Sequence, residues 1–107
     1  KHAMYGAAIM NSCADACLAE PNAGERAECI RRCLDASDAC TAFYRMGSRR
    51  TGGNVPAIKA IGEAVLVAVK ACHDLCKMHD DAHCKRCAKM CEEILADVRK
   101  ALDTMDR

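Results

Sequence analysis

The chain has 107 residues, of which sixteen are basic and fifteen acidic, so its formal net charge is only +1. Charges of both signs are interspersed, which excludes the basic footprint of a nucleic-acid-binding protein. The longest apolar run, residues 64–69, is far shorter than the roughly 20 residues of a membrane span. The length predicts one domain with a single modest core, covering residues 1–107.

Four amphipathic stretches are predicted to be helices: residues 4–19, 23–46, 57–77 and 82–105. Pro21 and Asn22 end the first helix, the only long loop separates the second from the third, and Pro56 suits the first turn of the third. Short, longer and short connections predict an all-α, antiparallel, up-down-up-down four-helix bundle.

The helical period predicts which side chains face inward. In the first helix the inward candidates are Ala8, Met10, Cys13 and Cys17. The first half of the third helix and the second half of the fourth carry an ordinary apolar core of Ile, Val and Leu. Aliphatic side chains must form this core, because the chain has only one Phe, two Tyr and no Trp.

Ten cysteines are the most informative feature of the composition. A short chain this rich in cysteine is usually held by disulfides. Here most neighbouring cysteines are four residues apart within predicted helices, where their nearly parallel Cα–Cβ bonds hinder the torsion angle of a disulfide. Free thiols are therefore expected, with disulfides between helices as the alternative.

The bundle topology brings these thiols together. The end of the first helix, the start of the second, the end of the third and the start of the fourth all lie at one end, so nine cysteines converge there and Cys40 marks the deepest level. The predicted metal ligands are the ten cysteines: Cys13, Cys17, Cys29, Cys33, Cys40, Cys72, Cys76, Cys84, Cys87 and Cys91.

Soft thiolates select Cu(I), Zn(II) or iron–sulfur clusters. Structural zinc sites and iron–sulfur clusters usually draw their thiols from loops and turns, whereas these cysteines lie within helices that face a narrow interior. Cu(I) fits this arrangement best, and several ions are expected. His79 and His83, in the turn over the thiols, are candidates for capping the metal or passing it in and out, or for simple solvated turn residues; Met78 is a candidate entry ligand.

Three runs carry a family resemblance: Cys-x-x-x-Cys-Leu-x-Glu-Pro at 13–21, Cys-Ile-x-x-Cys-Leu-Asp-Ala at 29–36, and Cys-x-x-x-Cys-x-x-His-Asp-x-x-His-Cys-x-x-Cys-Ala-x-x-Cys at 72–91. They resemble the bacterial cysteine-rich four-helix-bundle copper storage proteins. The resemblance implies interior thiolates that hold many Cu(I) ions, a homo-oligomer of bundles, and copper exchange with partners such as a copper chaperone.

The chain departs from the family pattern in one consistent way. Positions that commonly continue the thiol column carry other residues here: Gly6, Met10, Ala36, Gly62, Val65, Val69, Ile94 and Val98. Half of the interior is thus an ordinary core. The expectation is a lower copper capacity, with a discrete cluster at one end of the bundle.

Two other classes of function are alternatives to copper storage or buffering. One alternative is a zinc or iron–sulfur module for electron transfer or sensing, and another is a purely structural bundle. Catalysis is not expected, because the sequence shows no orienting group or oxyanion site beside a nucleophile. Reduced thiols and the absence of a signal-peptide pattern favour the cytoplasm, although a start at Lys1 is compatible with a removed export signal.

Overall fold

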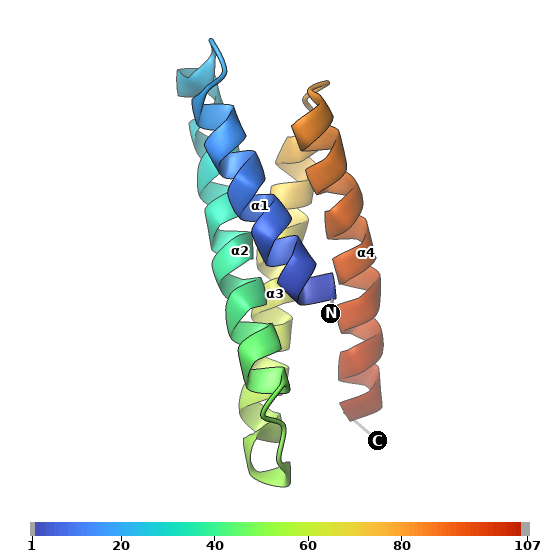
Figure 1. Ribbon diagram of the computed structural model, residues 1–107. Helices are drawn as coiled ribbons and strands as arrows, with labels where there is room; N and C mark the ends of the chain where they lie inside the picture. Colours follow the sequence, from blue (N-terminus) through green and yellow to red (C-terminus); the bar gives the residue numbers. More distant parts are fainter. Residues whose placement is uncertain (1, 106–107) are drawn as a thin grey trace.

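The computed structural model describes residues 2–105, with the side chain of His2 excepted. Its α-helices are α1 (His2–Leu18), α2 (Ala27–Gly47), α3 (Val55–Cys76) and α4 (Ala82–Met105). They run alternately up and down in one elongated bundle of 48 × 18 × 18 Å (Figure 1). The predicted all-α, antiparallel four-helix bundle is confirmed.

The turns between helices follow the punctuation of the sequence. Short 3₁₀ helices occupy Ala23–Arg26 (η1) and Gly52–Asn54 (η2). The segment predicted as the start of the second helix is thus a tighter turn, because the chain must reverse direction within a few residues of Pro21. Pro56 lies in the first turn of α3, where its missing N–H leaves no helical hydrogen bond unmade.

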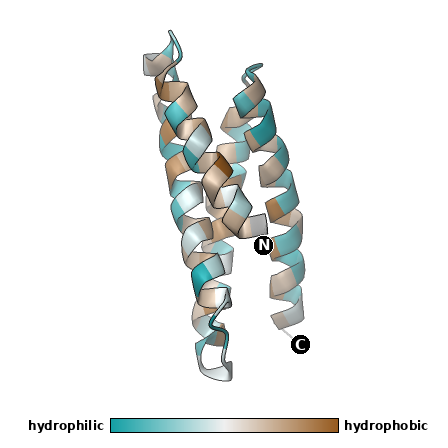
Figure 2. Ribbon diagram, in the orientation of Figure 1, coloured by the Kyte–Doolittle hydropathy of each residue, from teal (hydrophilic) through white to brown (hydrophobic). Residues whose placement is uncertain are grey.

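The α1–α2 and α3–α4 turns lie at the same end of the bundle, which is the upper end in Figure 1. Hydrophilic and hydrophobic residues alternate along the helices (Figure 2). At the upper end the inner sides are lined by cysteine, and at the lower end by residues such as Ile58, Val65 and Leu102. The predicted division of the interior into a thiol half and an apolar half is confirmed.

One inward prediction is wrong. Ala8 is exposed, whereas Ala7 is buried. The buried face of α1 also includes Met10 and Ala14, spaced three and four residues apart, and Ala8 falls on the other side of that stripe. Because alanine suits either face of a helix, its identity did not indicate the direction.

Two glycines allow the helices of the apolar half to approach closely. A Cβ atom added at Gly6 on α1 would overlap Ile94 of α4, and one added at Gly62 on α3 would lie 2.7 Å from Leu102 Cδ2. Both positions belong to the interrupted thiol column, so the close packing occupies space that a larger side chain would need.

Among the described residues no helix is long and apolar enough to cross a membrane.

Candidate metal centre

All ten cysteines are buried and present free thiols. In residues 2–105 no two of these sulfurs are joined in a disulfide, and a reduced thiol interior stays the expectation. The buried position follows from the helical period, since the cysteines on each helix are three, four or seven residues apart and share its inner face.

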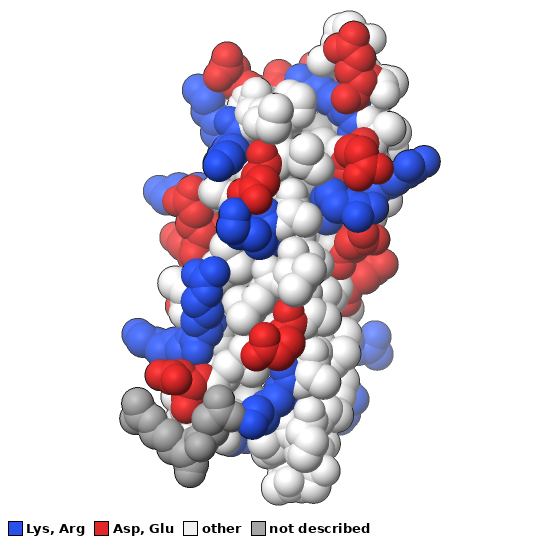
Figure 3. Space-filling view, turned by 180° about the vertical axis from the view of Figure 1, so that it is seen from behind, with Lys and Arg blue, Asp and Glu red and all other residues white. Residues whose placement is uncertain are grey.

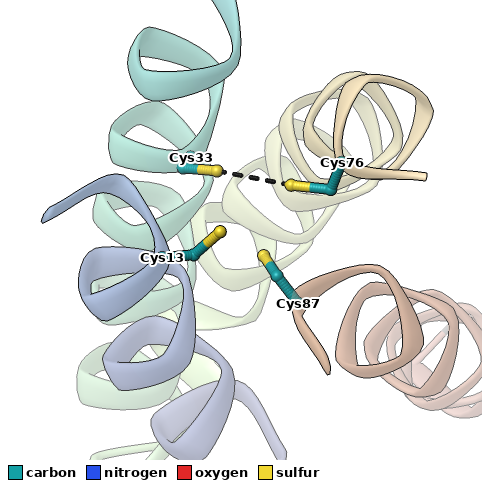
Figure 4. A group of neighbouring side chains, drawn as sticks. All are labelled: Cys13, Cys33, Cys76 and Cys87. Carbon is teal, nitrogen blue, oxygen red and sulfur yellow. Dashed lines mark hydrogen bonds between the residues drawn. The ribbon is translucent and has the colours of Figure 1, made fainter. Parts of the chain in front are cut away.

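A group of four thiols forms the centre of this interior. Cys13, Cys33, Cys76 and Cys87 each come from a different helix, and their sulfurs all lie within 4.8 Å of one another. Figure 4 shows the four side chains pointing toward a common point, with Cys33 and Cys76 joined by a contact of 3.6 Å between their sulfurs. A single metal ion at this point would have thiol neighbours from all four helices.

Deeper thiols continue from this central group. The sulfur of Cys72 lies 3.3 Å from that of Cys33 and 3.8 Å from that of Cys87. Cys91 completes a second group with Cys72 and Cys87, whose sulfurs also lie within 4.8 Å of one another. The two groups share Cys87, so metal ions bound in both would be linked by a common ligand.

Thiols nearer the upper end form a third group. Cys17 and Cys84 bring their sulfurs within 3.8 Å of each other, and Cys13 lies 4.0 Å from Cys84. The sulfur of Cys29 lies 3.7 Å from that of Cys76, so Cys29 adjoins the central group. Since Cys13 belongs to both this group and the central one, nine of the ten thiols form a single connected cluster.

Cys40 differs from the other nine. It is fully buried on α2, yet it belongs to none of the groups of close sulfurs among the described residues. Burial alone raises its pKa to about 12, as expected for a thiol surrounded by apolar atoms. The structure places it below the cluster, in agreement with its predicted position as the deepest thiol.

His83 is the histidine that the structure brings to the thiols. Its Nδ1 atom lies 3.6 Å from Cys13 Sγ and 3.5 Å from Cys84 Sγ, while its Nε2 atom lies 2.9 Å from Glu20 Oε1. A hydrogen bond donated by Nε2 to the carboxylate leaves the Nδ1 lone pair directed at the sulfurs. This is the orientation in which histidine usually binds metals.

The other two candidates for copper entry lie further out. His79 is half-buried in the α3–α4 turn, and Met78 beside it is 73% exposed. Neither side chain belongs to the groups of possible metal ligands among the described residues. The α3–α4 turn therefore holds His79 and Met78 nearer to solvent, while His83 at the start of α4 contacts the thiols.

Sequence reasoning missed two residues at this end. Arg26 of η1 is buried, and its guanidinium contacts the sulfurs of Cys17 and Cys84 and the carboxylate of Asp81. Glu20 holds His83. We use the word mouth for the four side chains around the outermost thiols: Glu20, Arg26, Asp81 and His83. One sequence signal could have identified these residues: the predicted topology places the α1–α2 and α3–α4 turns at the same end of the bundle as the thiols.

The thiols influence one another's acidity. Burial, reinforced by the neighbouring Cys17, raises the pKa of Cys84 to about 12. Hydrogen bonds from the surrounding thiols, with Cys13 first among them, lower the pKa of Cys76 and of Cys87. A buried thiolate is thus stabilised where several other thiols donate to it. Metal ions that replace these protons provide the stronger stabilisation.

A cluster of thiols with one imidazole matches the donor set preferred by Cu(I), a soft ion. The fold and the cluster together define a class of protein: a helical bundle whose interior stores soft metal ions on thiolates. A family model described as copper storage protein matches residues 1–103. The chain belongs to the copper storage protein family, and the predictions of family membership and of Cu(I) binding through interior thiolates are confirmed.

Solved structures agree with this assignment. A Streptomyces lividans structure described as a histidine-to-alanine mutant of Ccsp is 32% identical, with a TM-score of 0.92, and the match covers 97% of this chain and 88% of that chain. A second structure, described as copper loading with five coppers to a cytosolic copper storage protein from the same organism, is 33% identical. Its TM-score is 0.90, with 95% and 87% of the two chains covered. No curated protein matches the chain.

Proposed function

We propose that this protein stores or buffers Cu(I) in the cytoplasm by holding several ions on the nine connected thiols at one end of the bundle. The observation that carries the proposal is the central group of four thiols, one from each helix, within 4.8 Å of one another. The related Streptomyces protein is described as cytosolic and as carrying five coppers, which supports several ions and the same compartment here.

The ligands that we propose are the nine connected cysteines, without Cys40, which belongs to none of the groups of close sulfurs in the described chain. Shared thiols between neighbouring groups favour bridged copper ions over separate sites, and bridging thiolates are suited to Cu(I). A discrete cluster follows because the remaining half of the interior is filled by apolar side chains such as Ile58 and Val69. The protein acts by binding and release, without catalysis.

Copper entry is proposed to take place at the mouth. His83, already directed at Cys13 and Cys84, is suited to receive an incoming ion and pass it to the sulfurs. His79 and Met78, which lie nearer to solvent, would make transient contacts with copper during its transfer from a donor such as a copper chaperone. The sulfur donors of the cluster would favour soft Cu(I) over harder divalent ions.

We also propose that bundles associate into a homo-oligomer. The outward side of α3 carries an apolar stripe of exposed residues: Ala57, Ala60, Ala64 and Val67. Figure 3 shows the corresponding uncharged band running down the back of the molecule between charged groups. Small side chains at helical spacing allow another helix to approach closely. Val67→Glu should lower the mass measured by analytical ultracentrifugation; an unchanged mass would contradict the use of this face.

The experiment that tests copper storage is an anaerobic titration of the reduced protein with Cu(I) in the presence of a chromophoric chelator. Storage predicts that several equivalents are withheld before the chelator colours. Colour from the first addition would contradict tight copper binding. A brown, visible-absorbing protein after anaerobic purification would instead favour an iron–sulfur centre.

A further inference from the structure

Arg26 is the one charged side chain that is buried among residues 2–105, the side chain of His2 aside, with 6% of its surface exposed. It lies in η1, the turn that joins α1 to α2, and reaches into the thiol end of the bundle. Burying a guanidinium costs considerable free energy unless it is paired and hydrogen-bonded. The contacts of Arg26 therefore show which interactions offset the cost of its burial.

Each nitrogen of the guanidinium has a separate partner. The Nε atom donates to Asn22 Oδ1 at 2.9 Å, and Nη2 is paired with the carboxylate of Asp81 in the α3–α4 turn. The third nitrogen, Nη1, donates to Cys17 Sγ at 3.7 Å and to Cys84 Sγ at 3.6 Å. Two anchors thus fix the plane of the guanidinium, and the remaining nitrogen meets both of the outermost sulfurs.

These two sulfurs are suited to hold one copper ion together. They come from α1 and α4 and lie 3.8 Å apart. When Cu(I) binds to two thiols, both protons leave for the solvent, and the two thiolates with one monovalent ion carry one net negative charge. That charge would be largely removed from water, because Cys17 and Cys84 have no exposed surface. A fixed cation at hydrogen-bond distance offsets this cost.

We propose that Arg26 is the built-in counter-ion of a copper thiolate formed by Cys17 and Cys84, a positioning residue that holds the ion's ligands without binding copper itself. The inference rests on the proposed copper storage. It divides the mouth into two roles: His83 offers a ring nitrogen as a ligand beside Cys84, and Arg26 supplies positive charge to the same sulfur.

A lysine could not fill this role equally well. Its ammonium is a compact point charge, whereas the planar guanidinium can contact two sulfurs and two anchors at once. Loss of an outer partner of this kind usually lowers metal affinity by roughly 10-fold to 100-fold. The expected effect is confined to the copper ions that use Cys17 and Cys84, so the central group should be loaded as before.

The test compares Arg26→Gln, Arg26→Lys and the matched control Arg86→Gln, which removes an exposed arginine two residues beyond Cys84. Each reduced protein is titrated with Cu(I) against chelators of graded affinity, and circular dichroism of the metal-free protein checks the fold. We expect Arg26→Gln to release its weakest-held copper about 10-fold more readily, Arg26→Lys to recover part of the loss, and Arg86→Gln to match the wild type.

The inference is overturned if Arg26→Gln holds every copper as tightly as the wild type, or if Arg26→Lys with native helicity shows no recovery, which would indicate a purely structural contact. Either result would leave copper storage itself intact. If Arg26→Gln loses its helicity, Arg26→Lys is compared with Arg86→Gln: weaker binding of the weakest-held copper alone is expected, and equally weakened binding of every copper would refute the role. A wild-type protein that withholds no copper would refute the proposed function and this inference together.

Discussion

Cys33 and Cys40 provide a matched pair for testing the account of the cluster. Both are fully buried on α2, seven residues apart on the same face. The sulfur of Cys33 lies 3.3 Å from that of Cys72 and 3.6 Å from that of Cys76, whereas Cys40 lies outside the groups of close sulfurs in the described chain. Changing each to alanine therefore removes the same atom from two different surroundings.

The two variants should lose similar stability and different amounts of copper. Removal of one buried sulfur costs about 1 kcal/mol through lost contacts and a small cavity, and urea unfolding of both metal-free variants checks that they match. Cys33→Ala also removes a ligand from the central group, so its capacity should fall by about one copper equivalent or more, given the preference of Cu(I) for thiolate ligands. Cys40→Ala should retain the wild-type capacity.

Anaerobic titration with Cu(I) against a chromophoric chelator measures both capacities, and the total copper per chain is checked by elemental analysis. Equal losses in the two variants would mean that copper is not confined to the connected thiols. An undiminished capacity in Cys33→Ala would show that the central group is not a copper site, and the reasoning from sulfur distances would be wrong.

Three further predictions concern pH and packing. Burial raises the pKa of Cys40 from 9.0 to about 12. The protonated thiol therefore contributes its full stabilisation of the metal-free protein below pH 9. As the pH rises from 9 toward 12, the free energy of unfolding falls by about 1.4 kcal/mol per pH unit. Urea unfolding at increasing pH should show this loss, and Cys40→Ala should reduce it. Copper loading should release protons, because thiols become thiolates, and copper retention should weaken as the pH falls; proton release near zero in an unbuffered titration would contradict thiolate binding. Gly6→Ala should destabilise the protein by about 1–3 kcal/mol because its Cβ would overlap Ile94, whereas Gly24→Ala, which meets no atom within 4 Å, should cost far less in thermal unfolding.

The helices and the position of the thiols could be predicted from the sequence because their signals are local and periodic. Cysteines at helical spacing, proline near the start of α3 and a glycine-rich loop each act within a few residues. The short turns then determine which helix ends meet. The same reasoning left Ala8 on the wrong face, since alanine carries little directional information.

The mouth could not be predicted because it depends on contacts between turns that are distant in sequence. The carboxylate of Asp81, just before the start of α4, is paired with Arg26 of η1. The direction of a side chain from a 3₁₀ turn has no periodic signal. Similarly, His79 and His83 were both candidates, and only the structure directs His83, at the start of α4, toward Cys13 and Glu20.

The most direct test of the central claim is a crystal structure of the copper-loaded protein with anomalous diffraction recorded on both sides of the copper absorption edge. The account predicts several copper peaks, all among the sulfurs of the nine connected thiols, with the half of the bundle around Ile58 and Val65 free of copper. Copper peaks in that apolar half, or on surface residues without the central group of Cys13, Cys33, Cys76 and Cys87, would contradict it.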